Sequence, residues 1–323
     1  MASLAGKRVI VTGGAGFIGS HLVGRLLAEG VSHVAVVDNF FLGKEENLND
    51  ARRLVGERLK IYREDAADGA SMNAIFRAEH PDLVFNLATK ALLYSFFNPA
   101  GAAKVNFDIA LTLAELLRAG AFRRLIHLSS SEVYGTARFS PMTEQHPMLA
   151  ETSYAAGKAA ADLLLSSYVN MFGLEIVTVR PFNNYGPRQN DGALAAVVPM
   201  TIKRIASGQR PLIEGDGLQT RDFIYVDDTV SAILKLASED SLKGKVINLG
   251  SGEETSILEI VRAISDIMGY AGPFDHTAPR PADVRRHCAG IEVAREIIGA
   301  VATTPLTDGL RRTVEWYRDR RQA

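Results

Sequence analysis

Residues 8–19 read RVIVTGGAGFIG, an apolar run rich in β-branched residues that leads directly into glycines spaced three apart. The apolar run predicts a buried strand over 8–11, and the amphipathic stretch that follows predicts a helix over 18–29. Glycine at the strand end allows a sharp turn, the next lets backbone N–H groups approach a pyrophosphate, and the third lets helix and strand pack closely. Gly13, Gly16 and Gly19 therefore predict a dinucleotide site; the alternative is an ordinary tight turn.

Two acidic residues further along the chain support the dinucleotide interpretation. Asp38 ends the next predicted strand, about 20 residues after the glycines, where a carboxylate hydrogen-bonds the ribose diol. A carboxylate there repels a 2′-phosphate, so we expect NAD and not NADP. Asp65 follows the third predicted strand, where it can meet the adenine amine; the alternative is a helix N-cap.

Short apolar runs alternate with helical-period stretches up to about residue 180, which predicts an α/β fold with a Rossmann-like, doubly wound parallel sheet. The predicted strands are 8–11, 33–37, 59–62, 83–87, 124–128 and 175–179. The predicted helices are 18–29, 70–78, 99–119 and 154–172.

Prolines and glycines crowd the chain after Arg180, which indicates loops and the start of a smaller, C-terminal substrate-binding region. A helix over 223–237 and a strand over 245–249 are expected to return to the sheet. The predicted domains are thus 1–180, with 223–255 returning to it, and a second region of 181–222 and 256–323.

Composition excludes several classes of protein. The 36 Lys and Arg residues balance 37 Asp and Glu residues, so the chain lacks the basic surface expected of a nucleic-acid or membrane partner. The one cysteine, Cys288, cannot form an internal disulfide, and no Cys/His cluster has metal-ligand spacing. The first apolar run is too short for a signal peptide. We expect a cytoplasmic protein without a metal site.

A catalytic constellation follows the fifth predicted strand. Tyr154 and Lys158 are spaced i,i+4 at a predicted helix start and would share one face. Positive charge from Lys158 and a nicotinamide would bring the pKa of Tyr154 down toward neutral and make it a usable base. Ser130 lies at the carboxyl edge of the sheet, where doubly wound proteins bind ligands. Taken alone, a Tyr-x-x-x-Lys pair is usually structural.

Together these motifs resemble the extended short-chain dehydrogenase/reductase family, which contains the NAD-dependent nucleotide-sugar epimerases and dehydratases. The resemblance covers essentially the whole chain. The matching stretches are residues 12–19, Asp38, 86–88, Asn106, 130–135, Tyr154, Lys158, 180–188, 221–223 and 280–285.

The resemblance implies roles for individual residues. Ser130 would hydrogen-bond the sugar O4, Tyr154 would take its proton, and Lys158 would hold the nicotinamide ribose. NAD would also contact Gly13, Gly16, Phe17, Ile18, Gly19, Asp38, Asn39, Asp65, Ala66, Leu87, Ala88, Lys90, Asn106 and Tyr154. The nucleotide sugar would contact Lys90, Ser130, Ser131, Glu132, Tyr154, Asn183, Arg188, Arg221 and Arg280.

Glu132 bears on which reaction follows oxidation at C4. If the segment after Ser130 stays extended, Glu132 points to the same side as Ser130 and can remove the C5 proton that a 4-keto group acidifies. This favours a dehydratase acting on a UDP-sugar. The alternatives are a UDP-hexose or UDP-uronate 4-epimerase, a UDP-glucuronate decarboxylase and a non-catalytic NAD or nucleotide-sugar binding protein; a structural role for Glu132 is also open.

Departures from the family patterns keep these alternatives open. Ser131 stands where many 4,6-dehydratases have Asp, as in the GDP-mannose and some UDP-N-acetylglucosamine dehydratases. Lys90-Ala91 resembles the lysine loop of UDP-galactose 4-epimerases and of the tunicamycin-pathway dehydratase. Asn190 stands where uronate 4-epimerases tend to have Arg, which ranks uronates lower. The helices predicted over 99–119 and 154–172 match those that form a homodimer interface in the family, although their apolar faces could equally be monomer core.

Overall fold

The computed structural model describes residues 3–322, which form two compact units. Unit 1 runs through the described residues to Val133 and continues with Thr152–Arg180 and Val230–Ile247. Unit 2 contains Tyr134–Glu151, Pro181–Thr229 and the described residues from Asn248 onward. The outer bounds of the predicted domains, residues 1 and 323, lie outside the described residues.

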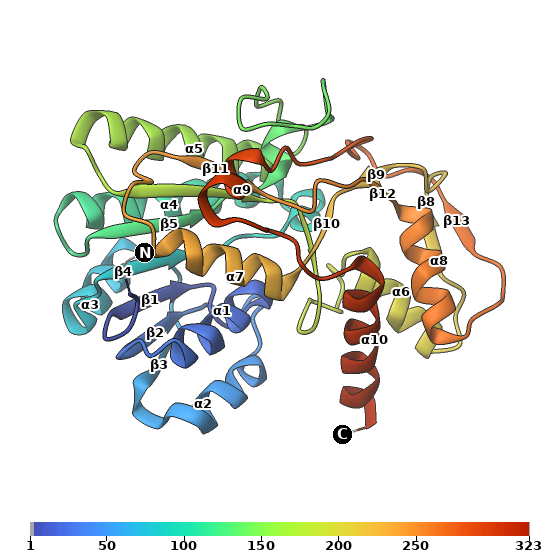
Figure 1. Ribbon diagram of the computed structural model, residues 1–323, viewed down its shortest axis with the longest axis horizontal. Coiled ribbons are helices and arrows are strands. Elements are labelled where there is room, and N and C mark those ends of the chain that lie inside the picture. Colours follow the sequence, from blue (N-terminus) through green and yellow to red (C-terminus); the bar gives the residue numbers. More distant parts are fainter. Residues whose placement is uncertain (1–2, 323) are drawn as a thin grey trace. The chain divides into compact units, whose positions relative to one another are not determined.

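A seven-stranded parallel sheet with the order β11-β6-β5-β4-β1-β2-β3 is built largely from unit 1 (Figure 1). Its strands are β1 (Arg8–Thr12), β2 (His33–Val37), β3 (Leu59–Tyr62), β4 (Leu83–Asn86), β5 (Arg124–Leu128), β6 (Ile176–Pro181) and β11 (Val246–Leu249). The order reverses between β1 and β4, which pair with Thr12 opposite Asn86. Ligands of doubly wound sheets bind at the carboxyl ends of strands at such a reversal. The predicted fold class is confirmed.

Helices cover both faces of the sheet. They are α1 (Phe17–Ala28), α2 (Asn49–Val55), α3 (Gly69–Glu79), α4 (Pro99–Arg118), α5 (Ser153–Phe172) and α7 (Val226–Ala237), with short 3₁₀ turns η1 (Glu45–Leu48), η2 (Gly56–Arg58), η3 (Leu92–Phe96) and η4 (Ser131–Tyr134). One core joins Ile10 and Val84 of the sheet to Phe76 of α3, Leu113 of α4 and Leu165 of α5. Because side chains alternate along a strand, the neighbouring residues point to the opposite face.

That opposite face carries α1 and α7, which lie side by side (Figure 1). Arg25 of α1 and Ser231 of α7 approach to 3.4 Å. One prediction is wrong here, because residues 223–225 do not begin a helix. They form β10 (Phe223–Tyr225), a fully buried apolar strand that pairs with β7 (Asn183–Tyr185), and α7 starts only at Val226.

Unit 2 consists of short strands and helices. In addition to β7 and β10 it contains α6 (Val197–Ala206), β8 (Leu212–Glu214), β9 (Thr220–Arg221), β12 (Thr255–Ser256), α8 (Ile257–Met268), β13 (Asp275–Thr277), α9 (Glu292–Ile298) and α10 (Leu306–Gln322). Strand β8 pairs with β13 in parallel, and β9 pairs with β12 antiparallel. A capping box between Ser256 and Glu259 fixes the start of α8.

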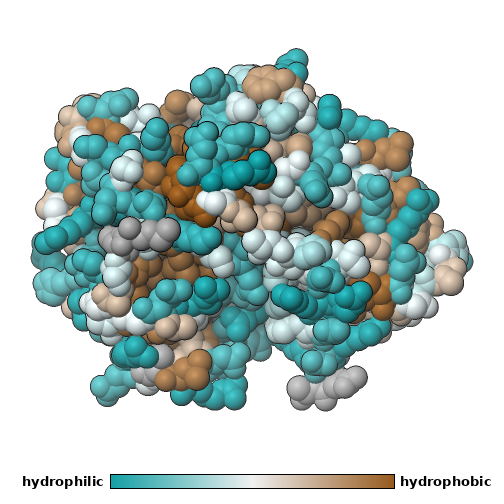
Figure 2. All heavy atoms as spheres, in the orientation of Figure 1, coloured by the Kyte–Doolittle hydropathy of each residue, from teal (hydrophilic) through white to brown (hydrophobic). Residues whose placement is uncertain are grey.

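Hydrophilic side chains dominate the face drawn in Figure 2, and hydrophobic ones form separate groups between them. Several large apolar side chains of unit 1 are exposed, among them Phe97, Leu163 and Met171. Across residues 3–322, none of the helices is long and apolar enough to span a membrane.

Candidate functional site

The glycine loop between β1 and α1 leaves no room for larger residues. Gly13 has a φ of +69°, and a Cβ there would lie 2.7 Å from the backbone nitrogen of Ala88. A Cβ on Gly19 would lie 2.2 Å from the carbonyl oxygen of Gly13. The loop, the start of α1 and the chain after β4 therefore pack backbone against backbone.

The start of α1 suits an anionic ligand. The N-cap is Gly16, and among the described residues no side chain caps this helix and no acidic residue lies in its first turn. The first N–H groups of a helix lack partners within the helix and attract negative charge. The uncapped, glycine-lined helix start, which includes Phe17 and Ile18, therefore fits the pyrophosphate of NAD.

Asp38 lies beside this loop at the end of β2. Its carboxylate accepts hydrogen bonds from the backbone N–H of Ala15 (2.9 Å) and of Phe40 (2.8 Å). Burial raises the pKa of Asp38, and these two backbone hydrogen bonds oppose that effect. A carboxylate has about four acceptor positions, so this one keeps capacity for a ribose diol.

Asn39 and Asp65 are brought together next to Asp38. Asn39 Nδ2 donates to Asp65 Oδ2 (2.9 Å), and the backbone N–H of Ala67 donates to Asp65 Oδ1 (2.9 Å). The residue that caps α3 is Asp68, which accepts from the backbone N–H of Ala70. The N-cap alternative for Asp65 is therefore wrong. Ala66, between these acidic residues, is buried in the core.

The lysine loop after β4 is anchored by Asn106 of α4. Asn106 Oδ1 accepts from the backbone N–H of Lys90 (3.1 Å) and from the hydroxyl of Thr89 (2.8 Å). The ammonium of Lys90 lies 3.5 Å from the ring centroid of Phe41 and 5.6 Å from that of Tyr94. Sequence reasoning missed both aromatic partners. Phe41 lies in the loop after β2, which meets the lysine loop only in the folded chain, and Tyr94 lies in η3, four residues after Lys90.

Tyr154 and Lys158 lie in the first two turns of α5, as the i,i+4 spacing predicts. The side chains of Ser130 and Thr89 lie close enough to the Tyr154 hydroxyl to lower its pKa. Lys158 Nζ donates to the carbonyl oxygen of Leu128 at the end of β5 (2.9 Å). The structure thus brings the predicted Ser130, Tyr154 and Lys158 together, and it adds Thr89.

The chain's own residues raise the pKa of Tyr154. Burial raises the pKa of Tyr154 to about 12; the hydrogen bond from Ser130 opposes this, and the charge of Glu132 adds to it. Burial also lowers the pKa of Lys158 to about 8. The expected lowering depends on a positive nicotinamide as well as on Lys158 and stays a prediction. The sequence did not reveal that both side chains are withdrawn from water.

Glu132 lies near this site, but its backbone conformation differs from the extended one expected. The segment after Ser130 is not extended but forms the 3₁₀ turn η4, in which the backbone N–H of Glu132 donates to Ser130 Oγ (3.2 Å). Ser131 is buried within the turn. The Glu132 carboxylate is close enough to Tyr154 for its charge to raise the tyrosine pKa.

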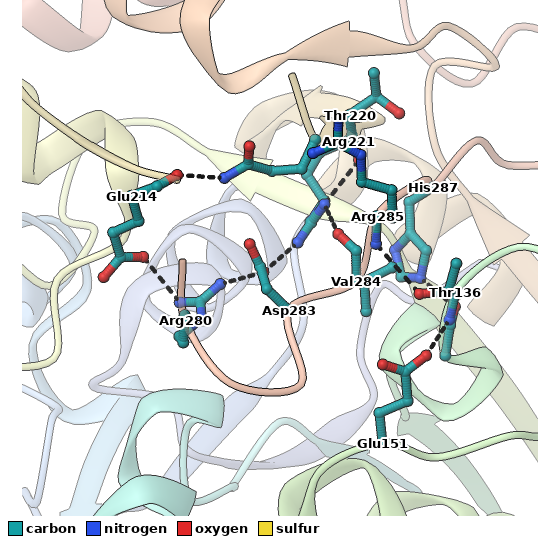
Figure 3. A network of polar contacts seen from close by, with 12 residues as sticks. Thr136, Glu151, Glu214, Thr220, Arg221, Arg280, Asp283, Val284, Arg285 and His287 are labelled. Atoms are coloured by element: carbon teal, nitrogen blue, oxygen red, sulfur yellow. Dashed lines mark hydrogen bonds and ion pairs between the residues drawn. The ribbon is translucent and has the colours of Figure 1, made fainter. Parts of the chain in front are cut away.

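Unit 2 gathers two of the predicted phosphate-binding arginines around one carboxylate (Figure 3). Asp283 Oδ1 accepts from Nη2 of Arg221 (2.7 Å) and from Nη2 of Arg280 (2.7 Å). Arg221 also donates to the carbonyl oxygens of Thr220 (2.8 Å) and Val284 (2.5 Å). Sequence reasoning matched the motif that contains Asp283 but did not select this residue.

The other two predicted substrate residues of unit 2 lie outside the network drawn in Figure 3. Asn183 is on β7, where its backbone N–H donates to the carbonyl oxygen of Asp222 (2.9 Å). Arg188 follows that strand and has a left-handed φ of 65°.

Comparison with known proteins agrees with these features. The model of the NAD dependent epimerase/dehydratase family matches residues 9–250. UDP-glucose 4-epimerase of Mycolicibacterium smegmatis is 35% identical over 98% of this chain and 100% of its own length. UDP-glucuronic acid decarboxylase 1 of Xenopus tropicalis is 32% identical over 97% of this chain and 72% of its own.

A solved structure extends the comparison to a third type of enzyme. The dTDP-glucose 4,6-dehydratase of Streptomyces venezuelae, crystallised with NAD, has a TM-score of 0.91 and 28% sequence identity, and covers 98% of each chain. The glycine loop, the Asp38 carboxylate and the Tyr154–Lys158 helix all lie in the region that the family model matches. The chain therefore belongs to the NAD dependent epimerase/dehydratase family.

Proposed function

We propose that this enzyme converts a nucleotide sugar through a transient 4-keto sugar, and that it is a UDP-hexose dehydratase. The observation that carries the proposal is the cluster of Ser130, Glu132, Tyr154 and Lys158 at the carboxyl edge of the sheet. A 4-keto intermediate needs a base for the O4 proton, and a dehydratase needs a second base for the C5 proton.

NAD, when bound, accepts hydride from C4, returns it to the sugar, and adds positive charge beside the phenol. The residues proposed to hold it are the glycines of the α1 start, Asp38, Asn39, Asp65, Lys90, Asn106 and Lys158. Supporting this are the uncapped start of α1 and the spare acceptor positions of Asp38.

Tyr154 takes the O4 proton, and Ser130 holds the same hydroxyl. The Ser130 side chain lowers the pKa of Tyr154. Positive charge nearby, such as the ammonium of Lys158 one helical turn away, also favours the phenolate. Because the pKa of Tyr154 is raised to about 12, mainly by burial, the base is poor until such charge is in place. Proton removal by Tyr154 would therefore depend on bound cofactor.

Glu132 then removes the C5 proton that the 4-keto group acidifies. The electron pair of the C5–H bond forms the C5–C6 double bond as the C6 hydroxyl leaves, and the proton taken by Glu132 is available to form water. Hydride delivered to C6 and a proton delivered to C5 give a 4-keto-6-deoxy sugar. The proximity of the Glu132 charge to Tyr154 supports this role.

A 4-epimerase is the second candidate. It is favoured by the 35% identity to a UDP-glucose 4-epimerase over nearly the whole chain and by Lys90 in the loop after β4. In that reaction hydride returns to C4 from the other face of the sugar, and Glu132 has no required role. The similarity to a UDP-glucuronic acid decarboxylase makes loss of CO₂ from a uronate a third outcome to test.

In unit 2, Arg221 and Arg280 are proposed to bind the diphosphate, with Asn183 and Arg188 contacting the nucleotide sugar. Forked guanidinium donors match phosphate oxygens. We also propose a homodimer formed through α4 and α5, supported by the exposed Leu163 and Met171 on α5.

Proton NMR in D₂O tests the reaction directly. The protein is incubated separately with UDP-glucose, UDP-N-acetylglucosamine and UDP-glucuronate. Deuterium at C5 with a new methyl or exocyclic alkene signal is expected. Inversion at C4 with C5–H retained would establish the epimerase, and a pentose product would establish the decarboxylase. No change in any tube would contradict catalysis on these UDP-sugars.

A further inference from the structure

Asp162 continues the line of catalytic residues along α5. Tyr154, Lys158 and Asp162 are spaced four residues apart, so their side chains lie on one face of the helix. Asp162 is 5% exposed and Lys158 is 2% exposed. A buried carboxylate thus follows the buried ammonium by one helical turn.

One side chain from the sheet hydrogen-bonds Asp162, and a second faces it. Arg180 of β6 donates through Nε to Asp162 Oδ2 (2.9 Å), and both side chains are buried. Nε2 of His127, on β5, lies 3.9 Å from the other carboxylate oxygen. The carboxylate is therefore fixed between α5 and the two strands that α5 covers.

A chain of hydrogen bonds determines which nitrogen of His127 carries the proton. The backbone N–H of Ala88 donates to Thr12 Oγ1 (3.4 Å), so the Thr12 hydroxyl donates to Asn86 Oδ1 (2.7 Å). Asn86 Nδ2 is then left to donate to His127 Nδ1 (2.8 Å). The proton of a neutral His127 is consequently on Nε2, directed at Asp162.

Charged and titratable groups from several elements surround Lys158. Tyr154 and Asp162 come from α5, His127 from β5 and Arg180 from β6, and Glu132 of η4 lies on the Tyr154 side. His127 is neutral, because burial lowers its pKa well below the usual range. Burial lowers the pKa of Lys158 to about 8, and the Asp162 charge opposes that lowering.

We propose that Asp162, held by Arg180 and faced by His127, is a positioning residue that keeps Lys158 charged beside Tyr154. The inference rests on the proposed function, in which the ammonium of Lys158 favours the phenolate. Asp162 acts through Lys158 and needs no contact with the sugar. Its own charge also raises the pKa of Tyr154, so the charge that it preserves on Lys158 must outweigh this direct effect. Loss of its charge would leave the buried Lys158 ammonium without the carboxylate that opposes the lowering of its pKa, and would favour the neutral amine.

Lysine side-chain NMR tests this without depending on turnover. The full chain, with the cofactor that it retains on purification, is labelled with ¹³C at the Cε of its lysines, and Lys158→Arg assigns the Lys158 signal. In Asp162→Asn the titration midpoint of Lys158 is expected to fall by about one pH unit or more. Asp162→Glu is expected to restore the midpoint, and Asp50→Asn, which removes an exposed carboxylate, to leave it unchanged.

An unchanged Lys158 midpoint in a folded Asp162→Asn protein would overturn the proposal, even if its melting temperature fell. Should that variant not fold, Arg180→Gln takes its place. Because Arg180 lowers the pKa of Asp162 through its charge and its hydrogen bond, removing it is expected to raise that pKa and so to move the Lys158 midpoint downward; no shift or an upward shift would overturn the proposal. If the wild-type protein turned over none of the nucleotide sugars, the proposed function would be rejected. The NMR titration would still test the role of Asp162.

Activity provides a second readout when turnover is found. Because only the ammonium form of Lys158 favours the phenolate, the alkaline limb of the pH profile of kcat is expected to move to lower pH in Asp162→Asn. A purely structural residue would lower kcat at every pH and leave the limb in place.

Discussion

Arg221 and Arg280 of unit 2 donate to the same oxygen of Asp283, each over 2.7 Å. The shared acceptor fixes the separation of two guanidinium groups before any anion arrives. Such preorganisation reduces the entropy that is lost when a diphosphate binds.

Asp283→Asn should weaken UDP binding by about tenfold or more, since charge-assisted hydrogen bonds each contribute about 1.5–3 kcal/mol. Titration calorimetry with UDP measures the effect. Asp216→Asn is the matched control, because Asp216 pairs with Arg285 at an exposed position of the same unit. Equal affinities for the Asp283→Asn variant and the wild type would show that the arginines need no such support.

Tyr154→Phe should reduce kcat by about 10²–10⁴-fold, because the O4 proton loses its base. Bound NAD, measured after release by denaturation, should stay at the wild-type level. Tyr168→Phe removes a hydroxyl from the same helix, where it bonds Glu115, and should leave kcat unchanged. Retained activity in Tyr154→Phe would rule out the proposed chemistry.

Glu132→Gln separates the two leading reactions. Under dehydration it should stop deuterium uptake at C5 while still allowing oxidation at C4, which is visible as absorbance of the reduced cofactor. Under 4-epimerisation it should change kcat little. Continued deuterium uptake at C5 in the variant would assign that proton to another base.

Gly13→Ala should abolish NAD retention, because the added Cβ would lie 2.7 Å from backbone atoms at a φ of +69°. Gly24→Ala is the control, since Gly24 lies within α1 with open space around it. That change should stabilise the protein by about 0.5–1 kcal/mol. Thermal unfolding and the cofactor content of the purified proteins check both outcomes.

We predict that the stability of the fold depends on pH through Glu79, the last residue of α3. Its carboxylate accepts from Arg8, Lys60 and Tyr62. Burial raises its pKa, but the hydrogen bonds from Tyr62 and Lys60 outweigh burial, so the folded-state pKa is lowered from 4.5. A lowered pKa contributes stability that is present above pH 4.5 and is lost as the pH falls through the folded value.

Glu79→Gln should therefore reduce the free energy of unfolding at neutral pH by about 1–3 kcal/mol and flatten its decline in acid. Urea unfolding at a series of pH values measures both quantities. A variant that declines in acid as steeply as the wild type would show that other carboxylates are responsible. Glu57→Gln, which changes an exposed acidic residue nearby in unit 1, serves as the control.

Local pattern was sufficient to predict the sheet and its glycine loop. β-Branched runs between helical stretches indicated all seven strands of the sheet, and the glycine spacing located a loop that admits no Cβ at Gly13. The prediction failed at Phe223–Tyr225, where three apolar residues suit a helix or a strand equally and the pairing with β7 decides. It also failed for Glu132, since period-two reasoning does not foresee a 3₁₀ turn.

Features that depend on burial or on distant partners were outside the reach of sequence reasoning. The pKa of Tyr154 depends on how deeply α5 packs, which the spacing of Tyr154 and Lys158 does not reveal. Asp162 and Arg180 are 18 positions apart, and Asp283 and Arg221 are 62 apart. Only the folded chain pairs such residues.

Because the chain returns to the sheet as β11, the position of this strand limits which fragments of the protein could fold. Strand β11 is the neighbour of β6 in the sheet, so a fragment ending at residue 180 would leave β6 as an open edge lined by Ile176, Val177 and Val179. Exposed apolar edges pair with other chains. A stable cofactor-binding fragment would need residues 230–249 fused to residue 180 through a short linker.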